Sequence, residues 1–360
     1  MWPLLFTLLV ACRPVVELGG GKRGDGGPDP SSSCEAGPCV PVGCTTEAAC
    51  EGTCVRTDAK RDRLVGGVEP IVSAFYDGNG DGRPDVVVFD LTTEDVHFYA
   101  GVDGSTWAVP RVVGVGRMQP GHAIGDFTGD GIEDLFLRQP EQWLARLLVG
   151  SQDGPSSAAD VPIASDSMEL VAHDANGDGD LDLLVARSDA RCLDVHVNAG
   201  NGAFFEPPVA CVAFPEGKYW RWSRRSVDVD GDSRAEMVGI PYAGGRMIAY
   251  DVDLSSTSLR EVGRWIVDAR AAIPLVTNAT GDASLELVAT TQDGVTAPWI
   301  YPAHLGATTP LCVGANPPTG IDPNDISDVD GDGAPDFVGI EFTRDAIVVS
   351  RSRVVPAFIQ

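Results

Sequence analysis

Residues 174–182 have the composition of a loop that binds a hard metal cation. Side chains with oxygen atoms stand at loop positions 1, 3, 5 and 9, which are Asp174, Asn176, Asp178 and Asp182. Glycines at positions 4 and 6 allow the tight turn that directs these oxygens toward one centre. Ca²⁺ is bound in this way, by several oxygens of mixed charge and by a backbone carbonyl at position 7. The loop therefore predicts a calcium site.

The residues around this loop predict strands, and not the helices of an EF-hand. An EF-hand begins with a similar loop, but it ends on a bidentate Glu at position 12 and lies between two helices. Position 12 here is Val185, and residues 183–186 form a short apolar run that is typical of a buried strand. The pattern therefore favours a strand–calcium loop–strand unit.

The same loop recurs along the chain. The six copies start 48 to 54 residues apart, at Asp77, Asp126, Asp174, Asp228, Asn278 and Asp328. Each copy has a glycine at position 4 and is followed by an acid and an apolar strand. A fixed period of this size indicates a repeat architecture, and each interval has room for about four strands. No convincing amphipathic helix lies between the loops, so the sequence predicts an all-β protein.

Two of the six loops depart from the pattern. The fourth has Ser233 at position 6, where the other loops favour glycine, but it keeps all its acids. The fifth has Asn278 and Thr280 in place of the first two acids and keeps only Asp282 and Glu286. We expect the fifth site to bind metal weakly or not at all.

The pattern D-x-[ND]-G-D-G-x-x-D at this period resembles the FG-GAP/VCBS repeats of integrin α chains and of many bacterial envelope proteins. The resemblance covers residues 62–360. It implies a β-propeller of six four-stranded blades, in which each calcium loop joins the first two strands of a blade. Seven-bladed members of the family make seven the alternative. Since each repeat takes about 50 residues, the length favours six.

The resemblance also implies the metal ligands, about five Ca²⁺ ions in all. A cation enclosed by protein oxygens stabilises a loop, whereas a catalytic metal needs an open coordination position, so we expect structural sites. Carbonyls of Arg83, Ile132, Asp180, Arg234 and Ala334 would complete the shells. The side-chain ligands are Asp77, Asn79, Asp81, Asp85, Asp126, Thr128, Asp130, Asp134, Asp174, Asn176, Asp178, Asp182, Asp228, Asp230, Asp232, Glu236, Asp328, Asp330, Asp332 and Asp336.

The amino-terminal region predicts export and a lipid anchor. Residues 1–11 form a signal peptide whose end, Leu9-Val10-Ala11-Cys12, resembles the lipobox of bacterial lipoproteins. That resemblance implies cleavage before Cys12 and lipidation of its thiol. Arg13 would then direct an enterobacterial lipoprotein to the outer membrane. A plain signal peptide, and hence secretion, is the alternative, because no Lys or Arg precedes the apolar run.

The cysteines predict disulfides. Residues 12–33 are a flexible tether rich in Gly, Pro and Ser, and residues 34–61 form a small module with five cysteines. Their spacing lacks the pairs or histidines of a zinc site, and an export signal favours disulfides. Cys192 and Cys211 flank a turn and are expected to pair across a hairpin. Cys312 then remains for the cysteine-rich module.

One segment stands out from the acidic background. Residues 218–225 combine aromatic and basic side chains, and Tyr219, Trp220, Arg221 and Trp222 form a possible ligand patch on the face opposite the calcium loops. The alternative is that both tryptophans pack between blades while the arginines offset nearby acids. The five histidines are scattered and match no catalytic motif.

We therefore expect a calcium-stabilised propeller that binds a protein or glycan ligand at the bacterial cell surface and catalyses nothing. The net charge of −26 excludes nucleic acid as a partner, since phosphates require a basic face. A secreted, calcium-dependent polysaccharide-degrading enzyme is one alternative. A structural subunit of an envelope complex is the other.

Overall fold

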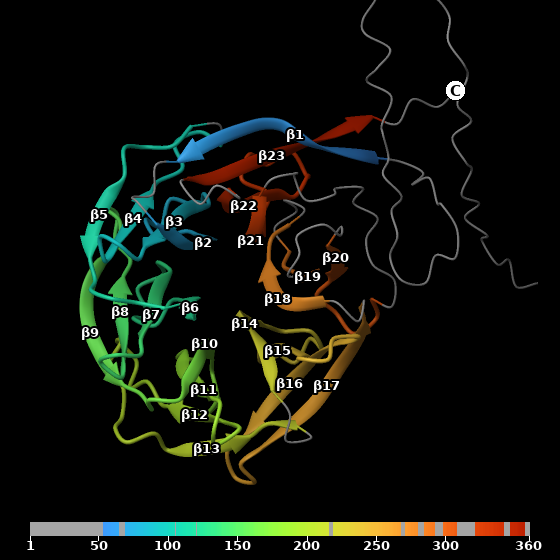
Figure 1. Cartoon of the computed structure of the whole chain (residues 1–360). Coiled ribbons are helices and arrows are strands. Elements are labelled where there is room, and N and C mark those ends of the chain that lie inside the picture. Colours follow the sequence, from blue (N-terminus) through green and yellow to red (C-terminus); the bar gives the residue numbers. More distant parts are fainter. Residues whose placement is uncertain are drawn as a thin grey trace, which may run out of the picture.

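The computed structural model describes residues 53–64, 69–104, 106–119, 121–215, 219–267, 271–279, 284–291, 298–307, 321–341 and 346–356. These residues form 23 strands arranged as six antiparallel sheets around a central axis (Figure 1). The fold is a six-bladed β-propeller, which confirms the predicted all-β class and the predicted number of blades. The signal peptide, the tether, residues 34–52 of the cysteine-rich module and Cys312 lie outside the described residues. Within the described residues, no helix has the length and apolar character to cross a membrane.

Each blade is a meander in which neighbouring strands pair in order from the axis outward. In the fifth blade the structure describes three strands. Blades one to three are β2 Pro70–Tyr76, β3 Asp85–Asp90, β4 Asp95–Tyr99 and β5 Arg111–Gly114; β6 His122–Gly125, β7 Asp134–Gln139, β8 Leu144–Val149 and β9 Ser156–Pro162; β10 Ser167–His173, β11 Asp182–Arg187, β12 Cys192–His196 and β13 Ala210–Ala213. Blades four to six are β14 Trp220–Val227, β15 Glu236–Pro241, β16 Arg246–Asp253 and β17 Ser258–Ile266; β18 Ala271–Thr277, β19 Glu286–Thr291 and β20 Trp299–Pro302; β21 Ile321–Ser327, β22 Asp336–Glu341, β23 Ile347–Pro356 and β1 Thr53–Leu64.

The apolar core lies between the blades, in one cluster at each of the six junctions. Side chains alternate across a strand, so a strand with two buried faces contributes to two clusters. In β3, Val87 and Phe89 pack toward blade two, whereas Val86 and Val88 pack toward blade six. This double burial explains why the second strand of each blade is a continuous apolar run. Packing therefore continues around the whole ring.

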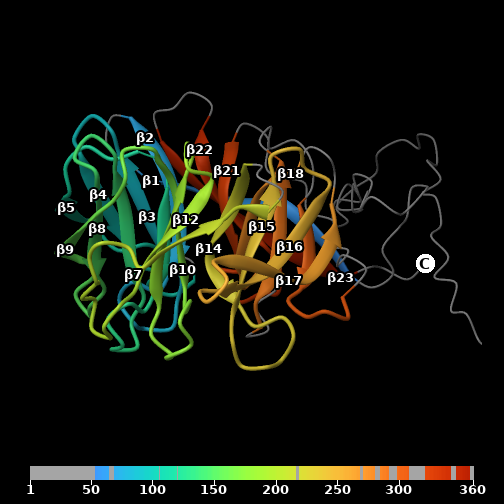
Figure 2. The same cartoon turned by 90° about the horizontal axis from the view of Figure 1, so that it is seen from below.

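The topology separates two faces of the propeller (Figure 2). The inner strands β2, β6, β10, β14, β18 and β21 all run in the same direction, and each ends at one of the six predicted loops. The loops and the connections from third to fourth strands therefore lie on one face, the metal-loop face. The hairpins between second and third strands and the links between blades lie on the other face, the hairpin face.

The ring closes through a strand that the sequence did not predict. β1 pairs antiparallel with β23, from Thr53 opposite Pro356 to Leu64 opposite Ile347, and becomes the outer strand of blade six. The expected domain boundary at residue 62 therefore falls inside β1. Asp62 binds buried Arg351 of β23 at 2.9 Å and accepts a hydrogen bond from the Trp107 indole of blade one at 3.2 Å. This ion pair joins both ends of the described chain to the first blade.

Breaking the Asp62–Arg351 pair should weaken the closed ring. Asp62→Ala leaves a buried guanidinium without this carboxylate, which typically costs about 3–5 kcal/mol of unfolding free energy. The exposed pair Arg117–Glu141, at 3.0 Å, provides the control, and Glu141→Ala should change stability by less than about 1 kcal/mol. Urea unfolding of both variants measures the difference. Equal small effects would contradict a role for Asp62 in closing the ring.

Candidate functional site

The aspartate at loop position 1 organises the turn through its carboxylate. In loop three, Oδ1 of Asp174 accepts hydrogen bonds from the amides of Gly177 at 2.7 Å and Asp178 at 3.2 Å, and Oδ2 accepts one from Gly179 at 2.9 Å. Asp328 makes the same three contacts in loop six. These bonds wrap the backbone around one carboxylate, as the spacing of the loop predicts.

Positions 3 and 5 tighten the same turn. Oδ1 of Asn176 accepts a hydrogen bond from the Asp178 amide at 2.8 Å, and Oδ1 of Asp178 accepts one from the Asp180 amide at 3.0 Å. The position-5 contact recurs in loops one, two, four and six. In loop two, the neutral Thr128 donates its hydroxyl to Asp126 at 3.5 Å. The side chains at positions 1, 3 and 5 thus lie around one small region on the metal-loop face.

The acid at position 9 has a structural task in all six loops. It is buried, and one of its oxygens accepts a hydrogen bond from the amide at position 2, as in Ala175 to Asp182 at 3.0 Å. In four blades the other oxygen accepts a hydrogen bond from the amide of the residue 16 positions later, as in Asn198 to Asp182 at 2.8 Å. One carboxylate therefore ties the loop to the connection after the third strand in blades one to three, and to the third strand β23 itself in blade six. The position-2 contacts of the other loops involve Gly78, Phe127, Val229, Ala279 and Val329.

The donor set of the loops fits a divalent cation. In loop four, oxygens of Asp228, Asp230 and Glu236 lie within 4.8 Å of one another, and those of Asp328, Asp330 and Asp332 do so in loop six. Oε1 of Glu236 is buried and accepts no hydrogen bond from the described residues. An acceptor in this position, beside two other carboxylates, matches the all-oxygen shell that a hard cation requires.

The electrostatics of the loops support the same interpretation. Burial, together with the neighbouring Asp330 and Asp328, raises the pKa of Asp336 to about 8. Burial likewise raises the pKa values of Asp85 and Glu236 to about 7, with contributions from the other acids of their loops. A bound cation reverses this effect by favouring the ionised carboxylates.

The fifth loop keeps its position-9 acid although it has no acid at positions 1 and 3. Oε2 of Glu286 accepts the Ala279 amide at 2.8 Å, and Oε1 accepts the Ser284 hydroxyl at 3.2 Å. The carbonyl of Asn278 accepts the amide of Asp328 in the next blade at 3.0 Å. Residues 280–283 lie outside the described residues, so the expected weak metal site stays a prediction.

The basic-aromatic segment does not form the predicted ligand patch. Trp220 and Trp222 are only 2% and 5% exposed, and they pack in the cluster between blades three and four. Their rings stack on each other with centroids 5.6 Å apart. The prediction that both tryptophans contact a ligand was therefore wrong, because alternate positions of inner strand β14 face the neighbouring blade. Tyr219 remains 38% exposed, and Arg221 pairs with Glu169 at 3.3 Å.

Two arginines of the same segment reach across the centre of the ring. The register of β14 against β15 shifts between Trp222 and Ser226. Arg224 binds Asp325 of blade six at 3.2 Å, and Arg225 binds Glu133 in the loop of blade two at 2.7 Å. Glu133 also accepts the amide of Asp77, the first residue of loop one, at 2.8 Å. The sequence indicates these arginines only as offsets for nearby acids, and it does not reveal that they connect blade four to the non-adjacent blades two and six.

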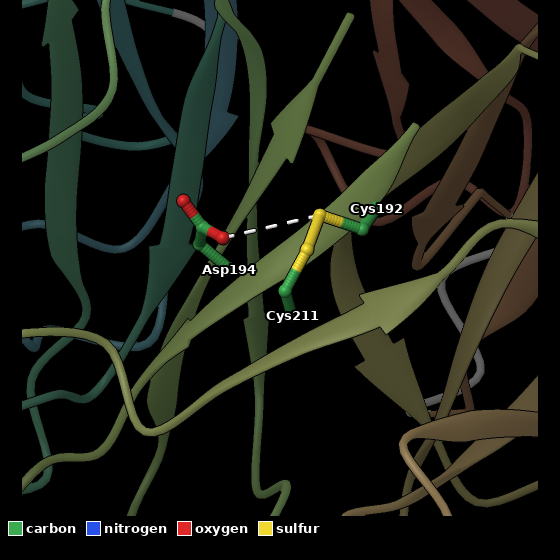
Figure 3. A group of neighbouring side chains, drawn as sticks. All are labelled: Cys192, Asp194 and Cys211. Atoms are coloured by element: carbon green, nitrogen blue, oxygen red, sulfur yellow. Dashed lines mark hydrogen bonds between the residues drawn. A yellow bond between two sulfur atoms is a disulfide. The ribbon is translucent and has the colours of Figure 1, made fainter. Parts of the chain in front are cut away.

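The predicted disulfide between Cys192 and Cys211 is confirmed (Figure 3). It joins β12 to β13, with Cα atoms 5.6 Å apart, and Asp194 lies 3.9 Å from the Cys192 sulfur. Both sulfurs are used in the bond, so the two cysteines form a structural crosslink and Asp194 lies beside it. Among the histidines, burial lowers the pKa values of His173 and His196 to about 4, which keeps both imidazoles neutral at pH 7.

Residues 142–239 match the family described as FG-GAP-like repeat. This segment lies within the six-bladed β-propeller. This match, together with the six blades, confirms the predicted resemblance, and it places the best-matching sequence across blades two to four. No curated protein matches the sequence.

Several solved structures are similar to this chain at low sequence identity. AofleA from Arthrobotrys oligospora has a TM-score of 0.51 at 12% identity, over 83% of this chain and 90% of that one. An auxiliary nutrient binding protein from Bacteroides ovatus has a TM-score of 0.49 at 10% identity, over 84% and 77%. The Tc holotoxin pore of Photorhabdus luminescens has a TM-score of 0.44 at 15% identity; the similarity covers 82% of this chain but only 14% of that one.

Ser233 tests the backbone requirement of the loops. Its φ of 71° is in the left-handed region, which a serine adopts at a cost of about 1–2 kcal/mol. Ser233→Gly should therefore raise the unfolding free energy by about 0.5–1 kcal/mol, after the greater entropy of unfolded glycine is subtracted. Thermal unfolding measures the change.

The reciprocal variant is the control. Gly179 is the equivalent residue of loop three, has a φ of 96°, and would place a Cβ in open space. Gly179→Ser should lower stability by a similar amount. A shift of the same sign in both variants would show that backbone conformation does not decide stability at this position.

Proposed function

We propose that this protein is a calcium-stabilised binding propeller of the bacterial cell envelope, anchored by lipid on Cys12. About five Ca²⁺ ions would be held by the loops of blades one to four and blade six. Their role is to keep the metal-loop face in one conformation, because the position-9 acids tie each loop to the body of its blade. The ligand, a protein or a glycan, would bind on the hairpin face.

One observation carries the proposal of binding. Three aromatic side chains on the hairpin face are exposed to solvent, Trp143 at 60%, Tyr242 at 76% and Tyr219 at 38%. Exposing a large aromatic side chain to water is unfavourable, and such side chains are enriched where proteins contact ligands. In the loops, by contrast, the acids are engaged in hydrogen bonds that hold the turn. A propeller that exposes three aromatic side chains on its hairpin face is suited to recognition.

Removing calcium should destabilise the protein in a pH-dependent way. With EDTA, the melting temperature should fall as the pH rises from 5 to 8, because the buried acids must give up protons that the folded state retains up to pKa values of about 7 or 8. Excess Ca²⁺ should raise the melting temperature and remove this slope, since it binds the folded state.

Metal analysis of the dialysed protein checks the number of sites and should find about five Ca²⁺ per chain. Glu236→Gln should lower the count by one, whereas Glu286→Gln in the fifth loop should leave it unchanged. Two or fewer ions in the wild-type protein would contradict the proposal of five sites.

Binding itself is tested with the full-length protein immobilised on a sensor and exposed to an envelope preparation of the producing bacterium. Saturable binding supports the proposal, and untreated, protease-digested and periodate-oxidised preparations identify the class of ligand. New reducing or unsaturated sugar ends in the same mixtures would favour the enzymatic alternative. Saturable binding to none of the preparations would contradict a binding function.

A further inference from the structure

The hairpins between second and third strands share one unusual backbone position. In each of blades one to four the hairpin loop has four residues, and the last of them, here named the closing residue, has a positive φ. The four closing residues are Glu94 at 58°, Trp143 at 57°, Arg191 at 53° and Gly245 at 85°. In blades five and six, residues 292–297 and 342–345 of the corresponding segments lie outside the described residues.

The fold requires this conformation in each of these blades. The carbonyl of each closing residue accepts the amide of a residue just beyond the blade's outer strand. The distances are 3.1 Å from Val115 to Glu94, 2.8 Å from Ile163 to Trp143, 2.9 Å from Phe214 to Arg191 and 3.3 Å from Val267 to Gly245. Glycine is the residue that adopts a left-handed conformation without strain, and blade four has it.

Blades one to three have large side chains where the backbone favours glycine. A Cβ at Gly245 would meet no atom within 4 Å, so the position is open to solvent and packing does not dictate the residue. A left-handed conformation is especially unfavourable for a bulky residue such as Trp143. Backbone stability therefore does not account for the side chains of Trp143 and Arg191. Strain of this kind concentrates at functional positions.

The Arg191 side chain contacts an aromatic residue on the hairpin face. The guanidinium of Arg191 lies over the Tyr219 ring, 5.5 Å from its centroid. The carbonyl of Tyr219 accepts the amide of Tyr242 at 3.0 Å, which places the two tyrosines side by side. Arg191, Tyr219 and Tyr242 thus form a cluster at the junction of blades three and four, named here the Arg–Tyr cluster. Trp143 occupies the closing position of the preceding blade.

The chemistry of this surface fits a carbohydrate. Exposed rings offer flat apolar faces to the C–H faces of sugars, while the tyrosine hydroxyls and the guanidinium offer hydrogen bonds to sugar hydroxyls. Ion pairs surround the rings, among them Arg117–Glu141 and Arg187–Asp166. The core of a protein interface is instead depleted in charge and needs a continuous apolar area. Separate rings among polar groups match a ligand that alternates apolar faces with hydroxyls.

We propose that the Arg–Tyr cluster and Trp143 form a carbohydrate-binding surface across blades two to four. This inference rests on the proposed binding function and names its ligand class and its residues. In this proposal Trp143 and Arg191 serve contact with sugar, at the expense of local backbone stability.

The experiment uses the full-length protein and a panel of immobilised oligosaccharides, with neutral members and members that carry uronic acid. The wild-type protein should bind at least one member of the panel, and titration calorimetry then gives its affinity. Tyr242→Ala and Trp143→Gly should each weaken binding about tenfold, since each removes a stacking ring. Trp143→Gly should also leave the melting temperature unchanged or raise it by about 2 °C, because it relieves the left-handed tryptophan.

Two control variants separate recognition from stability. Glu94→Gly makes the same backbone change in blade one and should affect melting as Trp143→Gly does, with binding kept within about twofold. Phe205→Ala removes a ring that is 55% exposed on the metal-loop face, and it should leave binding unchanged. If Trp143→Gly melts well below Glu94→Gly, the tryptophan is held by packing and the inference is overturned. Undiminished binding by Tyr242→Ala and Trp143→Gly also overturns it.

The outcomes that test the carbohydrate inference can be distinguished from those that test the proposed binding function. Binding of the envelope preparation that survives periodate but not protease indicates a protein partner, which overturns the carbohydrate inference and leaves the binding function in place. Loss of binding after periodate, with binding retained after protease, supports both. A preference for uronic acid members would show that Arg191 contributes through charge, and equal binding of neutral members would assign recognition to the rings.

Discussion

The buried carboxylate at loop position 9 is the group on which the geometry of each blade depends. Each of four such carboxylates accepts two hydrogen bonds. One oxygen accepts the bond from the amide at loop position 2, and the other accepts the bond from the amide 16 residues later. The four are Asp85, Asp134, Asp182 and Asp336. The acid stands at the start of the second strand, so it joins that strand to two separate segments of its blade. An apolar residue cannot replace these bonds, because the buried amides would lose their acceptors. This requirement explains why the fifth loop has Glu286 although it has no acid at positions 1 and 3.

The same carboxylates create an electrostatic demand that the protein chain does not meet by itself. Each is buried beside two or three other acids on the metal-loop face, and burial raises the pKa of Asp336 to about 8. The hydrogen bonds that the fold needs are stronger when the acid is ionised, whereas burial disfavours the charge. A bound divalent cation would resolve this conflict, since it would neutralise the loop while the acids keep their hydrogen bonds to the amides. The structural role of the acids and the proposed role of calcium are therefore two aspects of one constraint.

The parts of the fold that the sequence predicted are those set by short separations. The nine-residue loops recur at a regular interval, and Cys192 and Cys211 lie 19 residues apart across one hairpin. The closing strand β1 was missed because it pairs with β23 from the other end of the chain. Its sequence also has many polar residues and no regular alternation of apolar side chains. Trp220 and Trp222 were assigned to a ligand patch because a run of aromatic and basic residues does not reveal which side chains face a neighbouring blade. The shift in register after Trp222, which accompanies the contacts of Arg224 and Arg225 across the ring, has no signature in the residues themselves.

The two faces of the propeller follow from how many constraints act on each connection. On the metal-loop face, each loop must supply an acid at position 9, a glycine at position 4, and amides for the position-9 acid. Few of its residues can vary without loss of the turn. On the hairpin face, a loop has to supply only four residues and one left-handed carbonyl, and blades one to four satisfy this with Glu94, Trp143, Arg191 and Gly245. Side chains there can change from blade to blade while the ring is preserved. The acidic loops also lie on the far side, so their charge does not repel an anionic partner that approaches the hairpins. A propeller built in this way has one face committed to its own stability and the other available for recognition.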